Sequence, residues 1–433
     1  MHKNIIFVHL ESINNLTFKM HPQLFPNLYK IIDKGAYFQN YFSSATSTLM
    51  VVTDLMYGNM YRNESSINMK DGYKETHKMT SLFDYLKDIY GYHTGMISWP
   101  AVCEQEKFVS RKIIGENSEH ISLNNYQQFK DAIKQFMGAS EPFALFIADF
   151  ATHIEYQKHT KRRNASTIVR WKDTRKEADK LCGEIMELLE NKKKLNNTII
   201  VFYGDHGDDF WGHRLNNGYT HATEPYANII STPLIMYIPE YKGMHIRSEL
   251  VSTIDIKDIV LSALNEHTDD FLNVRNRKYI FSRNRYAGQK AKHLTFEKGF
   301  SVANKEYLLM VSYRGMEFYN IILDPQNTWN ILEFFEMDKN GNIVFNLKFK
   351  NLKSTHFLSY FRKVEINDII EQYQILRNAL MKEVYKIYNK ARLKEDLISQ
   401  ELAFNRIGIR HGYQLYNHKI VKWVGNKKDW SIF

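Results

Sequence analysis

Short apolar runs alternate with amphipathic segments along the first part of the chain. The runs are rich in Ile, Val and Phe and have the length of buried strands, whereas the segments between them repeat apolar residues every three or four positions. The expected strands are residues 4–10, 94–97, 143–150, 198–203 and 233–238, and the expected helices are residues 26–34, 81–89 and 173–190. This alternation predicts an α/β fold with a mostly parallel central sheet and helices on both faces.

The pattern changes after residue 275. Residues 306–312 and 318–323 have the pattern of antiparallel strands, and residues 367–402 are helical and heavily charged. We therefore expect three parts. They are an α/β domain over residues 1–275, a small β-rich α+β subdomain over residues 276–350 and a helical C-terminal extension over residues 351–433.

Polar residues that can bind metals follow three of the expected strands. Glu11 comes directly after the first strand, His153 follows the strand at 143–150, and Asp205 and His206 follow the strand at 198–203. Open α/β sheets bind their ligands at the carboxyl ends of the strands. The sequence therefore predicts a functional site at this edge of the sheet.

The segment 204–208, GDHGD, places Asp205 beside His206 on a tight turn. A carboxylate and an imidazole can bind one divalent metal, and the flanking glycines allow the backbone to approach the ion. There is an alternative interpretation for each part of this motif set. An Asp-His pair in a turn is also a common capping arrangement, and a lone Glu11 after a strand would usually be exposed to solvent. If the parallel strands bring these turns together, Glu11 completes an acidic metal pocket.

A cluster of hydroxyl residues, SSATST, ends at Thr48 and precedes an apolar helix over residues 49–56. One interpretation is helix capping by Ser47 or Thr48. The other uses the same position for chemistry, because backbone N–H groups and the helix dipole at an N-terminus favour an anion such as a phosphoryl group. A divalent metal nearby would lower the hydroxyl pKa and make Thr48 a nucleophile.

The succession of these motifs resembles that of the alkaline phosphatase and sulfatase superfamily. The opening NIIFVHLES is similar to the first strand of lipoteichoic acid synthases, residues 38–58 align on the nucleophile segment of sulfatases, and NTIIVFYGDHGD is similar to their second metal motif. The resemblance covers roughly residues 4–335 and implies an alkaline phosphatase-like fold with a catalytic first domain. It implies that Thr48 is the nucleophile and that Glu11, Thr48, Asp205 and His206 are metal ligands.

The chain departs from the sulfatase pattern around the nucleophile. Sulfatases carry Cys or Ser, which is converted to formylglycine and followed by Pro and Arg, where this chain has Thr48, Met50 and Val52. Threonine cannot give that aldehyde. The Glu, Thr, Asp and His set is similar to that of phosphoethanolamine and phosphoglycerol transferases, and it suits zinc or manganese better than calcium, with one or two ions bound.

The resemblance therefore implies a metal-dependent phosphoryl transferase or phosphodiesterase that acts through a phosphothreonine intermediate on Thr48. Its partners would be a phosphate-containing donor and a sugar or water acceptor. A surface glycan or its lipid-linked precursor would receive a substituent of the phosphoethanolamine or phosphoglycerol type. Two alternatives stay open, a sulfatase-type ester hydrolase and a non-catalytic relative that binds an anionic glycan.

Three further histidines and a basic run are candidates for substrate contacts. His153 and His221 match positions that contact substrate or a second metal in phosphoethanolamine transferases, and His213 competes with His221 for that position. Lys158 and Arg162 belong to a basic run that could attract a phosphate-bearing donor. The alternative interpretations are structural histidines and a solvated loop.

Composition and charge limit the binding partners and the cellular compartment that we expect. The formal net charge is +10, but no nucleic-acid-binding motif accompanies it, so we expect no nucleic acid partner. Cys103 and Cys182 lie far apart, which fits a reducing compartment. The first residues lack the apolar stretch of a signal peptide, and no run approaches the ~18 apolar residues of a membrane span. We expect a cytoplasmic protein, with peripheral contact to the inner face of the membrane left open.

Overall fold

The computed structural model describes most of the chain. The described residues are 2–60, 67–68, 72–73, 80–100, 111, 113–139, 141–153, 156, 164–209, 221, 224–241, 243–264, 274–284, 299–312, 315–337, 342–346, 364–390, 415–416 and 419–420. The chain divides into two compact units, Met1–Asp208 with Ile229–Arg277, and Asp209–Asn228 with Lys278–Phe433. The three-part division expected from the sequence stays a prediction.

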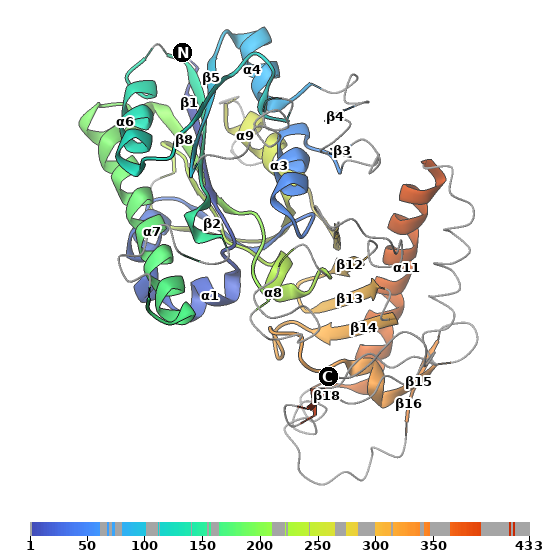
Figure 1. The fold of residues 1–433 in the computed structure, drawn as a ribbon. Coiled ribbons are helices and arrows are strands. Elements are labelled where there is room, and N and C mark those ends of the chain that lie inside the picture. The colour runs from blue at the N-terminus through green and yellow to red at the C-terminus, as the bar shows by residue number, and fades with distance from the viewer. Residues whose placement is uncertain are drawn as a thin grey trace. The chain divides into compact units, whose positions relative to one another are not determined.

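The first unit is built on an eight-stranded sheet (Figure 1). Its strands, in spatial order, are β10 (His245–Ser252), β2 (Ala36–Phe42), β9 (Leu234–Tyr237), β8 (Thr198–Gly204), β1 (Asn4–Leu10), β7 (Phe143–Asp149), β5 (His93–Trp99) and β6 (Glu119–Ser122). Only β9 runs antiparallel to its neighbours within this sheet. The predicted fold class, α/β with a mostly parallel central sheet, is confirmed.

Helices cover both faces of this sheet (Figure 1). They are α1 (Asn15–Met20), α2 (Pro26–Ile32), α3 (Thr48–Tyr57), α4 (Leu82–Tyr90), α6 (Tyr126–Phe136), α7 (Thr167–Asn191) and α9 (Ile256–Leu264). A four-residue helix, α8 (Ala227–Ile230), precedes β9 in the chain. Because helices cover both faces, β1, β7 and β8 are buried along their whole length, which explains their continuous apolar sequences.

Helix α7 begins six residues before the expected start at residue 173. Trp171 is buried on the same face as Ala178 and Cys182, so the apolar stripe extends one turn further toward the N-terminus than its charged neighbours suggest. Asp179 on α7 accepts hydrogen bonds from the backbone of α2, at Asn27 N (3.0 Å) and Leu28 N (2.8 Å). This carboxylate therefore fixes the start of α2 against α7.

The second unit contains a four-stranded antiparallel sheet and a long helix. The sheet is formed by β11 (Ile280–Arg283), β12 (Phe300–Ala303), β13 (Tyr307–Ser312) and β14 (Gly315–Asn320), and the helix is α11 (Ile366–Lys390). Among the described residues, three two-stranded pairs lie outside the two main sheets. In the first unit β3 (Ile67–Asn68) pairs with β4 (Gly72–Tyr73). In the second unit β15 (Phe335–Met337) pairs with β16 (Ile343–Phe345), and β17 (Leu415–Tyr416) pairs with β18 (Lys419–Ile420). The expected strand at 318–323 is shorter, because the Asn320 side chain accepts from the backbone N–H groups of Ile322 and Leu323 and turns the chain.

Among the described residues, no helix combines the length and the apolar character that a membrane crossing requires.

Candidate metal centre

The carboxyl ends of β1, β7 and β8 meet at one edge of the sheet. In the parallel register Leu10 pairs with Asp149 on one side and with Gly204 on the other. The residues that follow, Glu11 and Asp205, therefore emerge side by side. Strand pairing therefore brings together chain segments that are about 190 residues apart in the sequence.

Both carboxylates are buried, and Ser12 fixes them. Glu11 is 1% exposed and Asp205 is fully buried. The Ser12 backbone N–H donates to Asp205 Oδ1 (3.0 Å), and its hydroxyl donates to Glu11 Oε1 (2.8 Å). Ser12 adopts a left-handed conformation, with φ of 54°, which is unusual for a residue with a side chain. This backbone conformation lets Ser12 donate to both carboxylates. Strained backbone of this kind is often found at functional sites.

Gly204 allows the backbone to pack tightly behind Asp205. A Cβ atom at this position would lie 2.7 Å from the Ile13 carbonyl oxygen and 2.8 Å from Thr232 Cβ. Any larger residue would push β8 away from these neighbours. The glycine therefore serves close packing of the backbone. That the flanking glycines also let the backbone approach an ion stays a prediction.

Thr48 is the first residue of α3, and its hydroxyl points into the site. Thr48 Oγ1 lies 3.2 Å from Glu11 Oε2 and 3.1 Å from His206 Nε2. Ser47 occupies the N-cap position and makes no side-chain capping hydrogen bond. The capping interpretation therefore does not describe this helix start. Thr48 as a whole is half-buried.

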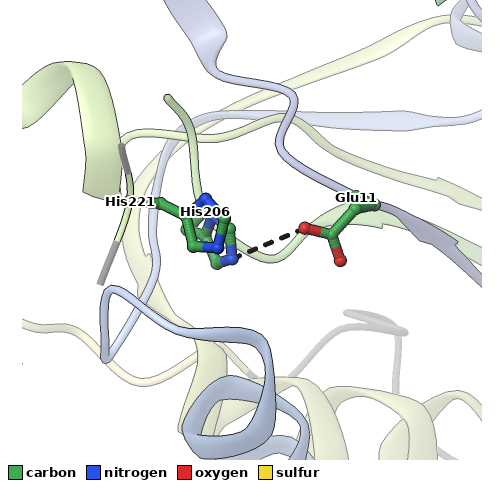
Figure 2. Close-up of side chains that lie close together, drawn as sticks. All are labelled: Glu11, His206 and His221. Carbon is green, nitrogen blue, oxygen red and sulfur yellow. Dashed lines mark ion pairs between the residues drawn. The ribbon is translucent and has the colours of Figure 1, made fainter. Parts of the chain in front are cut away.

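His206 is buried between the carboxylates and Thr48. Its Nε2 lies 3.2 Å from Asp205 Oδ2 and 3.6 Å from Glu11 Oε1, and Figure 2 shows this second ion pair. Its Nδ1 lies 3.2 Å from the Gly207 carbonyl oxygen. The contact with Gly207 favours a proton on Nδ1, which leaves Nε2 available to bind a cation.

A further buried histidine, His9, completes this cluster and was not singled out in the sequence. His9 Nε2 lies 3.0 Å from Glu11 Oε2 and 3.6 Å from Asp205 Oδ2. Burial lowers the pKa of His9, but the negative charges of Asp205 and Glu11 outweigh burial and raise this pKa above its ordinary value. A histidine inside an otherwise apolar strand is a signal that could have identified it.

The arrangement fits a divalent cation. Burial raises the pKa of Glu11, but the hydrogen bond with His9 and the charge of His206 outweigh burial and hold this pKa well below its ordinary value. Asp205 Oδ2 is buried and accepts no hydrogen bond from any described residue. Ligand atoms of His9, Glu11 and Asp205 lie close enough together to hold one ion. Carboxylate oxygens and imidazole nitrogens gathered in one buried site form a donor set that suits a divalent cation.

A buried arginine supports this centre from α7. Arg175 Nη2 donates to the Ser12 carbonyl (2.9 Å) and lies 3.6 Å from Asp208 Oδ2. Its Nη1 donates to the Thr152 carbonyl (3.2 Å). Arg175 therefore ties the Ser12 turn to the segment that leads into His153. The sequence interpretation missed it, although an arginine on the apolar face of an amphipathic helix is a recognisable signal.

The structure describes only some of the other predicted site residues. His153 follows a 3-10 turn at Phe150–Thr152 and is exposed, and its charge contributes to the low pKa of Glu11, so it lies near the centre. His221, also drawn in Figure 2, is half-buried and belongs to the second unit. His213, Lys158 and Arg162 lie outside the described residues.

Known proteins resemble the chain in sequence pattern and in fold. The sequence pattern of the sulfatase family matches residues 3–266. No protein with a curated description matches the chain.

Among solved structures, one protein, solved in complex with its substrate D-glucosamine-2-N,6-O-disulfate, is similar with a TM-score of 0.60 and 14% identity over 90% of this chain and 99% of that chain. The phosphonate monoester hydrolase of Agrobacterium radiobacter has a TM-score of 0.59 and 10% identity over 79% of this chain and 99% of its own. The lipoteichoic acid synthase LtaP from Listeria monocytogenes has a TM-score of 0.53 and 16% identity over 73% of this chain and 85% of its own. At these identities the likeness supports the fold.

Proposed function

Because the chain belongs to the sulfatase family, we propose that it is a metal-dependent phosphoryl transferase or phosphodiesterase with Thr48 as its nucleophile. The observation that carries the proposal is the position of the Thr48 hydroxyl. It lies at the start of α3, within 3.2 Å of both a buried carboxylate and a buried imidazole. A hydroxyl that served only to cap the helix would point back to the backbone.

Glu11, Asp205, His206 and Thr48 would hold the cation. When bound, a zinc or manganese ion would lower the pKa of the Thr48 hydroxyl and neutralise charge that develops on the substrate. The start of α3 presents backbone N–H groups that lack helical acceptors, and these can bind the oxygens of an anionic ester.

The first step forms a bond between Thr48 Oγ1 and phosphorus and breaks the ester bond to the leaving alcohol. The Thr48 hydroxyl gives up its proton to solvent water, and Glu11, whose pKa is held well below its ordinary value, stays ionised. His153, exposed and near the centre, gives a proton to the leaving alkoxide and later removes one from the acceptor. His221 is the alternative to His153 for this proton transfer, and that role stays a prediction.

The acceptor decides between transfer and hydrolysis. A sugar hydroxyl would give a glycan with a phosphoryl substituent of the phosphoethanolamine or phosphoglycerol type, and water would give a phosphodiesterase. A surface glycan or its lipid-linked precursor is the acceptor we propose, and LtaP, a lipoteichoic acid synthase, supports a polymer of that kind.

Sulfate ester hydrolysis is a second candidate, and the comparisons favour it. The family match is to sulfatases, and one structural neighbour was solved with a disulfated glucosamine as its substrate. The threonine at the nucleophile position favours phosphoryl transfer, because threonine cannot be converted to formylglycine. The two candidates differ in the atom that Thr48 attacks.

Intact-mass measurement after incubation with three aryl esters tests the proposal. We expect a phosphoryl-containing adduct on Thr48 from an aryl phosphodiester or aryl phosphate, with less turnover of the aryl sulfate. Thr48→Ala should abolish the adduct and lower kcat by about a thousandfold or more, because the nucleophile is lost. Ser47→Ala is the matched control, since Ser47 is the neighbouring hydroxyl without a capping bond. Faster turnover of the aryl sulfate would favour the second candidate, and an unchanged rate in Thr48→Ala would refute both.

A further inference from the structure

We propose that His9 is a fifth protein ligand of the cation, through Nε2, in addition to the four residues assigned above. This inference rests on the metal centre of the proposed function. It concerns the penultimate residue of β1, an otherwise mostly apolar strand, and neither the motifs nor the family match assigns a role to this residue.

Five side-chain atoms form a closed ring at this site, and the distances around it suit one coordination shell. Starting at Thr48 Oγ1, neighbouring atoms are 3.1 Å apart to His206 Nε2, then 3.2 Å to Asp205 Oδ2 and 3.6 Å to His9 Nε2. The ring closes through Glu11 Oε2, which is 3.0 Å from His9 Nε2 and 3.2 Å from Thr48 Oγ1. Nitrogen and oxygen ligands lie about 2.0–2.2 Å from zinc, so neighbours at angles of about 90–120° are roughly 2.8–3.8 Å apart. All five distances fall in this range.

The orientation of the His9 ring is that of a ligand. Strand register places His9 opposite Tyr203, and His9 Nδ1 lies 3.0 Å from the Tyr203 hydroxyl. The two rings meet edge to face, with centroids 5.4 Å apart. Histidines that bind metals usually hold the other ring nitrogen in a hydrogen bond, which fixes the tautomer and the ring plane. His206 shows the same pattern through Gly207.

His9 has one competing role, a hydrogen bond to Glu11 from outside the coordination shell. In that case Nε2 carries a proton and only orients the carboxylate. In our proposal Nε2 of His9 carries no proton, and its lone pair faces the cation. The cation also becomes the partner of Asp205 Oδ2. Two imidazole ligands would also shift the preference of the site from calcium or magnesium toward zinc.

X-ray absorption of the zinc-loaded full-length protein counts the imidazoles bound to zinc and separates these roles. We expect at least two imidazoles in the wild type and one fewer in His9→Gln, whose zinc dissociation constant should rise at least tenfold. Tyr203→Phe should keep the imidazole count and weaken zinc binding roughly 10–100-fold, as for other lost partners of ligating histidines. His93→Gln is the matched control, because His93 is at the amino end of β5 in the same sheet, and it should change neither quantity.

An imidazole count that is the same in the wild type and in folded His9→Gln would overturn the inference and leave the metal centre in place. Absence of stoichiometric zinc binding in the wild type would overturn the proposed function as well. Far-UV circular dichroism checks folding. Should His9→Gln fail to fold, zinc-soaked crystals of the wild type decide, since an anomalous peak about 2.0–2.3 Å from His9 Nε2 supports ligation and one beyond about 3 Å refutes it.

Discussion

Replacing Arg175 with Met tests whether the buried arginine holds the metal-site turn in place. Arg175 is 1% exposed, and methionine keeps most of its apolar volume while it removes the charge and every donor. The change would leave the Ser12 and Thr152 carbonyls without these donors, and it would leave Asp208 without its cationic partner at 3.6 Å. The perturbation therefore concentrates on the segments beside the candidate metal centre.

The expected cost follows from the charge that stays behind. Removal of one partner of a buried ion pair costs about 3–5 kcal/mol, because the remaining charge is uncompensated. Asp208 keeps a hydrogen bond from the Tyr156 hydroxyl (2.6 Å), which limits the cost. Arg175 also lies 4.8 Å from the ring centroids of Tyr156 and Trp171, and the variant loses both cation–π contacts. We expect the free energy of unfolding to fall by about 3–5 kcal/mol.

Urea unfolding followed by circular dichroism measures this loss. Lys180→Met is the matched control, since Lys180 lies on the same helix, is 62% exposed and pairs with Glu184 at 3.9 Å, a surface pair expected to contribute less than about 1 kcal/mol. The double variant Arg175→Met/Asp208→Asn should recover part of the loss, because it also removes the stranded charge. A loss below about 1 kcal/mol for Arg175→Met would refute the assignment of Arg175 as the support of this turn.

Three further predictions concern the first unit. Asp179→Ala removes three hydrogen bonds at the start of α2 and should cost about 2 kcal/mol in thermal or urea unfolding, and an unchanged stability would contradict it. Burial raises the pKa of Glu141, but the hydrogen bonds from Lys194 and Asn4 together with the charge of Lys194 outweigh burial and lower this pKa below its ordinary 4.5. The stability that this pair contributes is therefore present at neutral pH and lost as pH falls through the folded-state pKa. Glu141→Gln should therefore lose up to about 1 kcal/mol at pH 7 and converge with the wild type in acid, whereas a constant difference would count against the pair. Burial raises the pKa of Cys182 well above its ordinary value, so peptide mapping should find Cys182 alkylated at pH 8 only in unfolded protein.

The fold could be predicted from the sequence where strands are buried on both faces. The strands β1, β7 and β8 are continuous apolar runs, and such runs have few other interpretations. Strand β2 was missed because exposed Gln39 interrupts its apolar pattern, and β10 was missed because it lies at the sheet edge and alternates buried and exposed positions. Partial exposure removes the apolar continuity on which the prediction depends.

The site could be predicted only where side chains belong to recognisable motifs. Glu11, Thr48, Asp205 and His206 follow strands or begin a helix, and the structure brings all four together. His9 could have been noticed as a histidine within an apolar run, but its contact with Tyr203, 194 positions away, is revealed only by the register of β1 with β8. Contacts of this kind depend on tertiary structure, and no local pattern encodes them.

Calorimetric titration of metal-free protein with zinc tests most directly whether Glu11 and its neighbours hold a cation against Thr48. We predict binding of at least one ion per chain in the wild type and at least a hundredfold weaker binding in Glu11→Gln, because a buried anionic ligand is lost. Glu141→Gln, the surface control, should bind as the wild type does. Equal zinc affinity in Glu11→Gln and the wild type would contradict the account.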